Sequence, residues 1–169
     1  MSELPELVID RAFDAPRELV WREWTDPDLL GRWYGPNIET VVHRFDLTVG
    51  GVWLHEMKMG GGSNFQKAVF KEINQPERLV WHHYSSVDLE GNDTASPMMP
   101  DWPKVLLTTL TFEAMGEKTN VRLSQIPFEP TDNEIAVFAK MKDGMSGGWG
   151  KGYAIIDDDS YRVTGRVGL

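Results

Sequence analysis

The sequence predicts a domain of the α+β class, built on an antiparallel sheet with one long helix near its C-terminal end. Two short helical patterns occupy the region between residues 16 and 34, directly after a first strand. Six strand-like segments then follow at hairpin-compatible spacing, which is typical of an antiparallel meander. The long helical pattern comes last, after residue 131. Strands that run together before a helix, instead of alternating with helices, indicate the α+β class.

The N-terminal part predicts one strand and two short helices. Residues 7–13 alternate between apolar and polar, as a strand requires. Pro16 disfavours helix at the residue before it and suits the first position of a helix. The apolar stripe of that helix is formed by Val20, Trp21 and Trp24. Asp26 can cap a second helix that begins at Pro27. The stripe of the second helix is Leu29, Leu30, Trp33 and Tyr34.

The strands of the meander are separated by glycine-rich turns and by one longer loop. They are expected at residues 39–47, 52–59, 65–73, 78–86, 104–114 and 118–128. Gly50-Gly51 and the run Gly60-Gly61-Gly62-Ser63 supply permissive backbone for two of the turns. The loop 87–103 carries three prolines together with Met98, Met99 and Trp102. A loop of this length either covers a site as a lid or runs over the surface.

The last element opens with Thr131 and Glu134 at the spacing of a capping box. Apolar and small residues then recur every three or four positions, at Phe138, Met141, Met145, Trp149, Gly152 and Ile156. This pattern predicts a helix of about seven turns with one apolar face. Its five glycines are Gly144, Gly147, Gly148, Gly150 and Gly152. They indicate either a close approach to the sheet or a kink, or room left for a ligand. We expect the helix to end near Asp157-Asp158-Asp159, before a tail at 160–169.

Composition restricts the class of protein. The 169 residues suit a single domain, with its core between residues 7 and 158 and net charge −9. This charge argues against nucleic acid and anionic membranes as partners. The absence of cysteine excludes disulfides, thiolate metal sites and cysteine nucleophiles. No segment reads as a signal peptide or a membrane span, so we expect a cytoplasmic protein without membrane insertion.

No motif points to a cofactor, a metal or a catalytic residue. The glycines around Lys151 lack the spacing and the preceding strand of a phosphate loop or dinucleotide fingerprint. His82 and His83 are adjacent on a strand, so they face opposite sides of the sheet. His55 and His83 can face the same interior, but an intervening strand separates them by about 9–10 Å, too far to share a metal. They are either structural residues or polar contacts for a ligand.

Several short motifs together resemble one family. They are Arg11-Ala12-Phe13-Asp14-Ala15-Pro16, Trp24-Thr25-Asp26-Pro27, Leu30-Gly31-Arg32-Trp33-Tyr34-Gly35-Pro36, Gly50-Gly51-Val52-Trp53, Pro76-Glu77-Arg78-Leu79-Val80, Leu110-Thr111-Phe112-Glu113, Gly144-Met145 and Gly148-Trp149. In this order the chain resembles the SRPBCC (START/Bet v 1-like) superfamily, and within it the branch of heat-shock-protein (Hsp90) ATPase activator homologues. The resemblance implies the helix-grip fold, in which a curved sheet of about seven strands wraps around the C-terminal helix. Members bind lipids, hormones and polyketides, a few catalyse cyclisation, and the activator branch is named for a chaperone.

Three functions are therefore open. The first is a module that binds a small hydrophobic or aromatic molecule in a cavity between helix and sheet. Its expected contacts are Trp33, Tyr34, Trp53, His55, Met57, Trp81, His83, Trp102, Leu107, Thr109, Met141, Met145 and Trp149, with Trp33 and Tyr34 near the mouth. The second is a protein-interaction module, as a monomer or a homodimer, related to the chaperone activators. The third is a cyclase or hydrolase that would use His55 or His83 beside its substrate.

Overall fold

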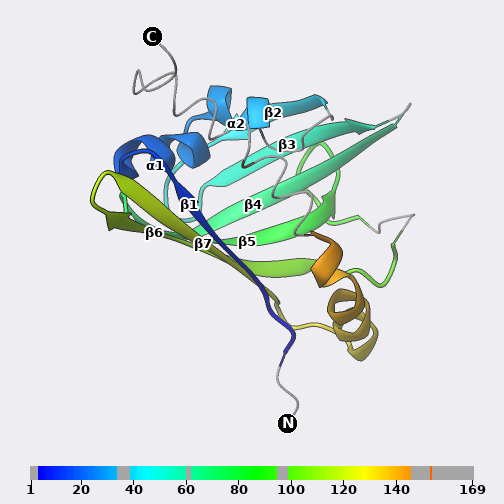
Figure 1. The fold of residues 1–169 in the computed structure, drawn as a ribbon. Coiled ribbons are helices and arrows are strands. Elements are labelled where there is room, and N and C mark those ends of the chain that lie inside the picture. The colour runs from blue at the N-terminus through cyan, green and yellow to red at the C-terminus, as the bar shows by residue number, and fades with distance from the viewer. Residues whose placement is uncertain (1–3, 34–38, 60–61, 95–98, 146–152, 154–169) are drawn as a thin grey trace.

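The structure, a computed structural model, describes residues 4–33, 39–59, 62–94, 99–145 and 153. Seven strands form one antiparallel sheet in the order β1-β7-β6-β5-β4-β3-β2. Figure 1 shows that this sheet is strongly curved, with β1 and β2 at its two edges. The strands are β1 (Leu7–Phe13), β2 (Glu39–Phe45), β3 (Val52–Met59), β4 (Gly62–Asn74), β5 (Arg78–Val87), β6 (Val105–Met115) and β7 (Lys118–Pro127). The predicted fold class is confirmed.

Two short helices connect β1 to β2: α1 (Arg17–Thr25) and α2 (Pro27–Trp33). The prediction that Pro16 is the first helical residue is wrong by one position. Pro16 is the N-cap, with extended backbone angles, and the helix begins at the next residue. In α2 the prediction is confirmed, because the Asp26 carboxylate accepts a hydrogen bond from the backbone N–H of Asp28 at 3.0 Å.

A further helix is described over residues 132–145, and residue 153 is helical again. The capping box at its start is confirmed. The Thr131 N–H donates to Glu134 Oε1 at 3.0 Å, and the Glu134 N–H donates to Thr131 Oγ1 at 3.1 Å. At Gly144 an added Cβ would meet nothing within 4 Å, so a close approach to the sheet does not explain this glycine. The other four glycines, the aspartate run and the tail 160–169 lie outside the described residues.

The core lies on one face of the sheet, which we call the inner face. Its larger cluster packs five tryptophans from α1, α2, β3 and β5 with aliphatic and aromatic neighbours. Tyr153 is fully buried in this cluster, 5.2 Å from the ring of Phe13. A smaller cluster joins Phe138 to Leu7 and Leu106, which lie at the N-terminal ends of β1 and β6. Of the described C-terminal residues, Tyr153 therefore packs in the larger cluster and Phe138 in the smaller one, while Figure 1 shows the helix 132–145 beside one end of the sheet.

The loop between β5 and β6 is anchored at both of its described ends. The Asp88 carboxylate accepts hydrogen bonds from the backbone N–H groups of Glu90 and Asn92, at 3.0 and 2.9 Å. At the other end the Trp102 ring packs on Phe138 at a tilt of 48°, with ring centroids 5.5 Å apart. Residues 95–98 lie outside the described residues, so the interpretation of this loop as a lid stays a prediction. No helix in the described part of the chain is long and apolar enough to cross a membrane.

Candidate functional site

The inner face carries the predicted residues of β3 and β5. Trp53 and His55 alternate with outward-facing residues on β3, and Trp81 and His83 do the same on β5; all four are buried. Pairing through Ala68 of β4 places Trp53 and His83 on the same face. Met57, also predicted, is partly buried and packs against the larger core cluster.

The predicted contribution of β6 is wrong. Leu107 pairs with His82 and Thr109 pairs with Val80 of β5, so both predicted residues lie on the outer face of the sheet. The inner-face residues of β6 are Leu106, Thr108 and Leu110, all buried. The run Val105–Leu110 holds two adjacent leucines and two adjacent threonines. Each face of the strand therefore carries one of these leucines and one of these threonines. Alternation alone therefore cannot decide which set points inward.

Trp33 does not lie at a mouth. It is 1% exposed, packs edge to face on Trp24 with ring centroids 4.4 Å apart, and donates its Nε1–H to the Glu23 carbonyl at 2.7 Å. It belongs to the packed core that α1 and α2 bring to the sheet. Tyr34, the other residue predicted at the mouth, lies outside the described residues, as does Trp149.

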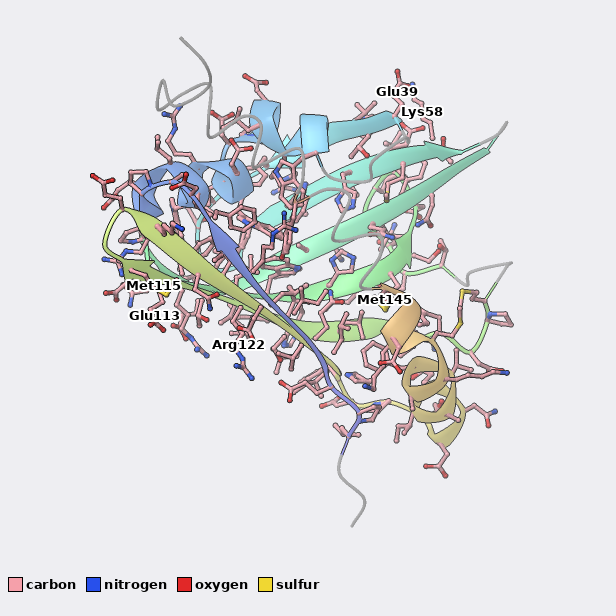
Figure 2. The ribbon with its side chains drawn as sticks, in the orientation of Figure 1. Glu39, Lys58, Glu113, Met115, Arg122 and Met145 are labelled. Atoms are coloured by element: carbon pink, nitrogen blue, oxygen red, sulfur yellow. The ribbon has the colours of Figure 1, made fainter. Side chains whose placement is uncertain are left out.

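The predicted residues near the C-terminal helix divide into two groups. Met145, at the end of the described helix in Figure 2, and Trp102 pack against the smaller core cluster around Phe138. Met141 is instead 43% exposed, so its predicted inward position is wrong. It follows Phe138 by three residues, a step of about 300° around a helix, and therefore points about 60° away from it. The apolar stripe is narrower than the sequence indicates.

His55 and His83 lie closer together than predicted. Their ring centroids are 6.2 Å apart, although β4 runs between their strands. Gln66 of β4 bridges them: its Oε1 lies 3.2 Å from His55 Nε2 and 2.8 Å from His83 Nε2. The register between β4 and β5 shifts between Phe65 and Lys67, which flank this residue. Strand spacing describes the backbone, but side chains converge on the inner face of a curved sheet and a register shift re-aims them.

The indole of Trp81 extends this network. Its Nε1–H donates to His83 Nδ1 at 3.3 Å. We call these four residues, Trp81, His83, Gln66 and His55, the inner-face cluster. Gln66 is partly buried and the other three are buried. The inner-face cluster forms a continuous polar path across the three strands β3, β4 and β5.

Both histidines of the inner-face cluster are neutral near pH 7. Burial lowers the pKa of His55 to about 3, and the neighbouring His83 adds to this effect while the hydrogen bond with Gln66 opposes it. Burial also lowers the pKa of His83, to about 4. The charged form of an imidazole is disfavoured in a poorly hydrated interior, which explains both directions.

Sequence reasoning missed three polar residues of the inner face. Gln66 pairs directly with His55, because the β3–β4 hairpin closes with Met59 opposite Gly62. The glycine run predicts a turn, but a hairpin centred on the run Gly60–Ser63 would pair His55 with Ala68, so only the observed register identifies Gln66. On β7 and β6, the Gln125 amide donates to Thr108 Oγ1 at 3.2 Å. Gln125 Oε1 is buried and has no hydrogen-bond partner among the described residues.

Two ion pairs lie on the outer face of the sheet. Glu56 contacts the His43 ring nitrogen at 2.8 Å and accepts a hydrogen bond from Ser63. Lys58 pairs with Glu39 at 3.1 Å, on the strand at the sheet edge (Figure 2). Among the described residues, no group of three or more histidines and acidic residues could hold a metal ion.

The family model described as activator of Hsp90 ATPase homolog 1-like protein matches residues 14–158. A protein from Arthrobacter aurescens, solved by NMR, is 25% identical with a TM-score of 0.74, covering 90% of this chain and 83% of that one. Crystal structures from Mycobacterium smegmatis (19% identity, TM-score 0.74, 93% and 94% covered) and Chromobacterium violaceum (18%, 0.70, 92% and 97%) share the fold. Among curated proteins, none matches the chain.

Proposed function

Because the chain belongs to the family of activator of Hsp90 ATPase homolog 1-like proteins, we propose that it binds a small, mostly apolar or aromatic molecule. The molecule occupies a cavity between the inner face of the sheet and the C-terminal helix. It contacts the inner-face cluster with its polar end and the surrounding aromatic side chains with its apolar part.

The inner-face cluster is the observation that supports this proposal. Burying polar groups costs free energy, which the hydrogen bonds among Trp81, His83, Gln66 and His55 only partly offset. Ligand sites in proteins are mostly apolar surfaces that carry a few convergent polar groups, often with shifted pKa values. The cluster has these properties, and it lies on the face whose core clusters include Phe138 and Tyr153 of the C-terminal part of the chain.

NMR titration with an apolar aromatic compound tests the proposal, because β5 contains a matched control. His82 and His83 are adjacent but face opposite sides of the sheet. We expect the imidazole resonances of His83 to shift with saturable binding, and those of His82 to remain in place. Shifts confined to His82, or no binding across a panel of apolar compounds, would contradict the proposal.

A protein partner is the second candidate, because the family description names activators of the Hsp90 ATPase. The exposed large apolar side chains of the described residues lie on separate elements: Leu4, Val8, Val49, Leu89, Met115, Phe128 and Met141. Stimulation of a purified Hsp90 ATPase by this chain would support the second candidate, and sedimentation of the chain alone would test the homodimer.

Binding is favoured over catalysis by the state of the two histidines. A general base works best when its pKa lies near the working pH. The pKa values of His55 and His83, lowered to about 3 and about 4, leave both imidazoles neutral and weakly basic at pH 7. In this proposal the two imidazoles orient a neighbouring group by hydrogen bonding and take no part in proton transfer.

A further inference from the structure

The hydrogen bonds of the inner-face cluster run in one direction. An indole nitrogen can only donate, so His83 Nδ1 must accept from Trp81 and carries no proton. A neutral His83 then carries its proton on Nε2. That N–H donates to Gln66 Oε1, 2.8 Å away. Trp81 thus sets the tautomer of His83, and His83 sets the acceptor atom of Gln66.

The orientation of the Gln66 amide follows. Its Oε1 accepts from His83 and lies 3.2 Å from His55 Nε2, which therefore acts as a second donor. Exchanging the amide oxygen and nitrogen would place N–H against N–H at His83, so the flipped amide is excluded. The NH2 group of Gln66 keeps two hydrogens, and among the described residues Nε2 has no hydrogen-bond partner. The side chain is only partly buried, so this donor can be reached.

We propose that the Gln66 NH2 group is the specificity-determining donor of the inner-face site, and that it selects a neutral apolar ligand with a carbonyl-type oxygen. This inference rests on the proposed function. The ligand oxygen accepts a hydrogen bond from the Gln66 NH2 group, while the hydrocarbon part of the ligand packs against the indole rings of Trp53 and Trp81. A carboxylate is disfavoured, because the side chains that contact Gln66 are neutral and an uncompensated buried charge is costly.

Three naphthalene probes separate the possibilities: 2-acetylnaphthalene carries the neutral acceptor, 2-ethylnaphthalene lacks it, and 2-naphthoate is anionic. The variant Gln66→Glu keeps oxygens that accept from both histidines but removes the NH2 donor. Gln75→Glu, at an exposed turn, introduces the same charge elsewhere. Dissociation constants at pH 7.5 give the ratio of ketone to hydrocarbon affinity for each protein.

We expect Gln66→Glu to reduce the ketone-to-hydrocarbon ratio by about fivefold to tenfold, which is the effect of losing one hydrogen bond. Gln75→Glu should leave the ratio at the wild-type value. In the wild-type protein, the side-chain NH2 resonances of Gln66 should shift with the ketone and not with the hydrocarbon. This second measurement does not depend on the stability of any variant.

Three results would overturn the inference. If both neutral probes bind and Gln66→Glu leaves their ratio unchanged, the donor role is wrong while the proposed function stands. If 2-naphthoate binds most tightly, the selection of a neutral ligand is wrong. If none of the probes binds the wild-type protein, the proposed function fails and the inference fails with it.

Discussion

Mild acid should destabilise this protein through the two buried histidines. The pKa values of His55 and His83 are lowered from 6.5 to about 3 and about 4 in the folded protein, mainly by burial. An unfolded chain binds protons at these groups near pH 6.5, while the folded chain binds them only near pH 4 and below. The two histidines therefore cost no stability above pH 6.5. The free energy of unfolding falls as the pH is lowered from 6.5 toward the pKa values of the folded state.

The expected loss is large compared with the stability of a typical domain. At pH 5.0 the unfolded-state pKa lies 1.5 units above the solution pH, and each unit corresponds to about 1.4 kcal/mol. Each histidine then costs about 2 kcal/mol, and the pair about 4 kcal/mol, of a typical 5–15 kcal/mol. The lowered pKa values of Glu56 and Asp88, whose charged forms accept hydrogen bonds, act near and below pH 4.5, outside this range.

Urea unfolding followed by tryptophan fluorescence at several pH values between 7.5 and 5.0 measures this loss. The variant His83→Gln should remove about half of the pH dependence. His82→Gln is the control: burial lowers the pKa of this partly buried neighbour too, but it should remove much less. An unfolding free energy that stays constant from pH 7.5 to 5.0 would refute the assignment of both histidines as buried and neutral.

Three further outcomes are expected. Thr131→Ala removes the hydroxyl that accepts the Glu134 N–H and should lower the unfolding free energy by about 1 kcal/mol, whereas Thr131→Ser should not; equal losses would contradict the capping role. Gly144→Ala should raise the unfolding free energy by up to about 1 kcal/mol, because the site is helical and open, and a decrease would show that the glycine is needed. The 15N spectrum of His83 at pH 7 should show a protonated Nε2 and a bare Nδ1, and the opposite tautomer would contradict the hydrogen-bond direction.

Local chemistry predicted most of the fold. The strands β1 and β3 have the predicted ends, and four of the other strands differ by one or two residues, as hydrogen bonding extends or shortens a strand at its turn. The strand β4 begins at Gly62 instead of residue 65, because a β-hairpin continues its ladder up to the turn. The capping box at Thr131 and the cap at Asp26 could be predicted from the sequence, because each hydrogen bond joins residues only two or three positions apart.

The candidate site was less predictable, since it depends on register and curvature. Leu107 and Thr109 were assigned to the wrong face because their neighbours have the same side chains. His55 and His83 were expected to be too far apart, because strand spacing ignores the convergence of side chains on a curved face. Gln66 carries no sequence signature of its own, and only the exact register of the β3–β4 hairpin places it opposite His55, which the glycine run does not fix.

The central claim is that a ligand binds at the inner face, with its acceptor oxygen on Gln66. Intermolecular NOEs between 2-acetylnaphthalene and assigned side chains of the wild-type protein test it most directly. We predict NOEs from the acetyl methyl group to the Gln66 side-chain amide and from the rings to Trp81 or Trp53. NOEs to His82 and Phe128, whose rings pair with centroids 4.3 Å apart, would place the ligand on the outer face and contradict the claim.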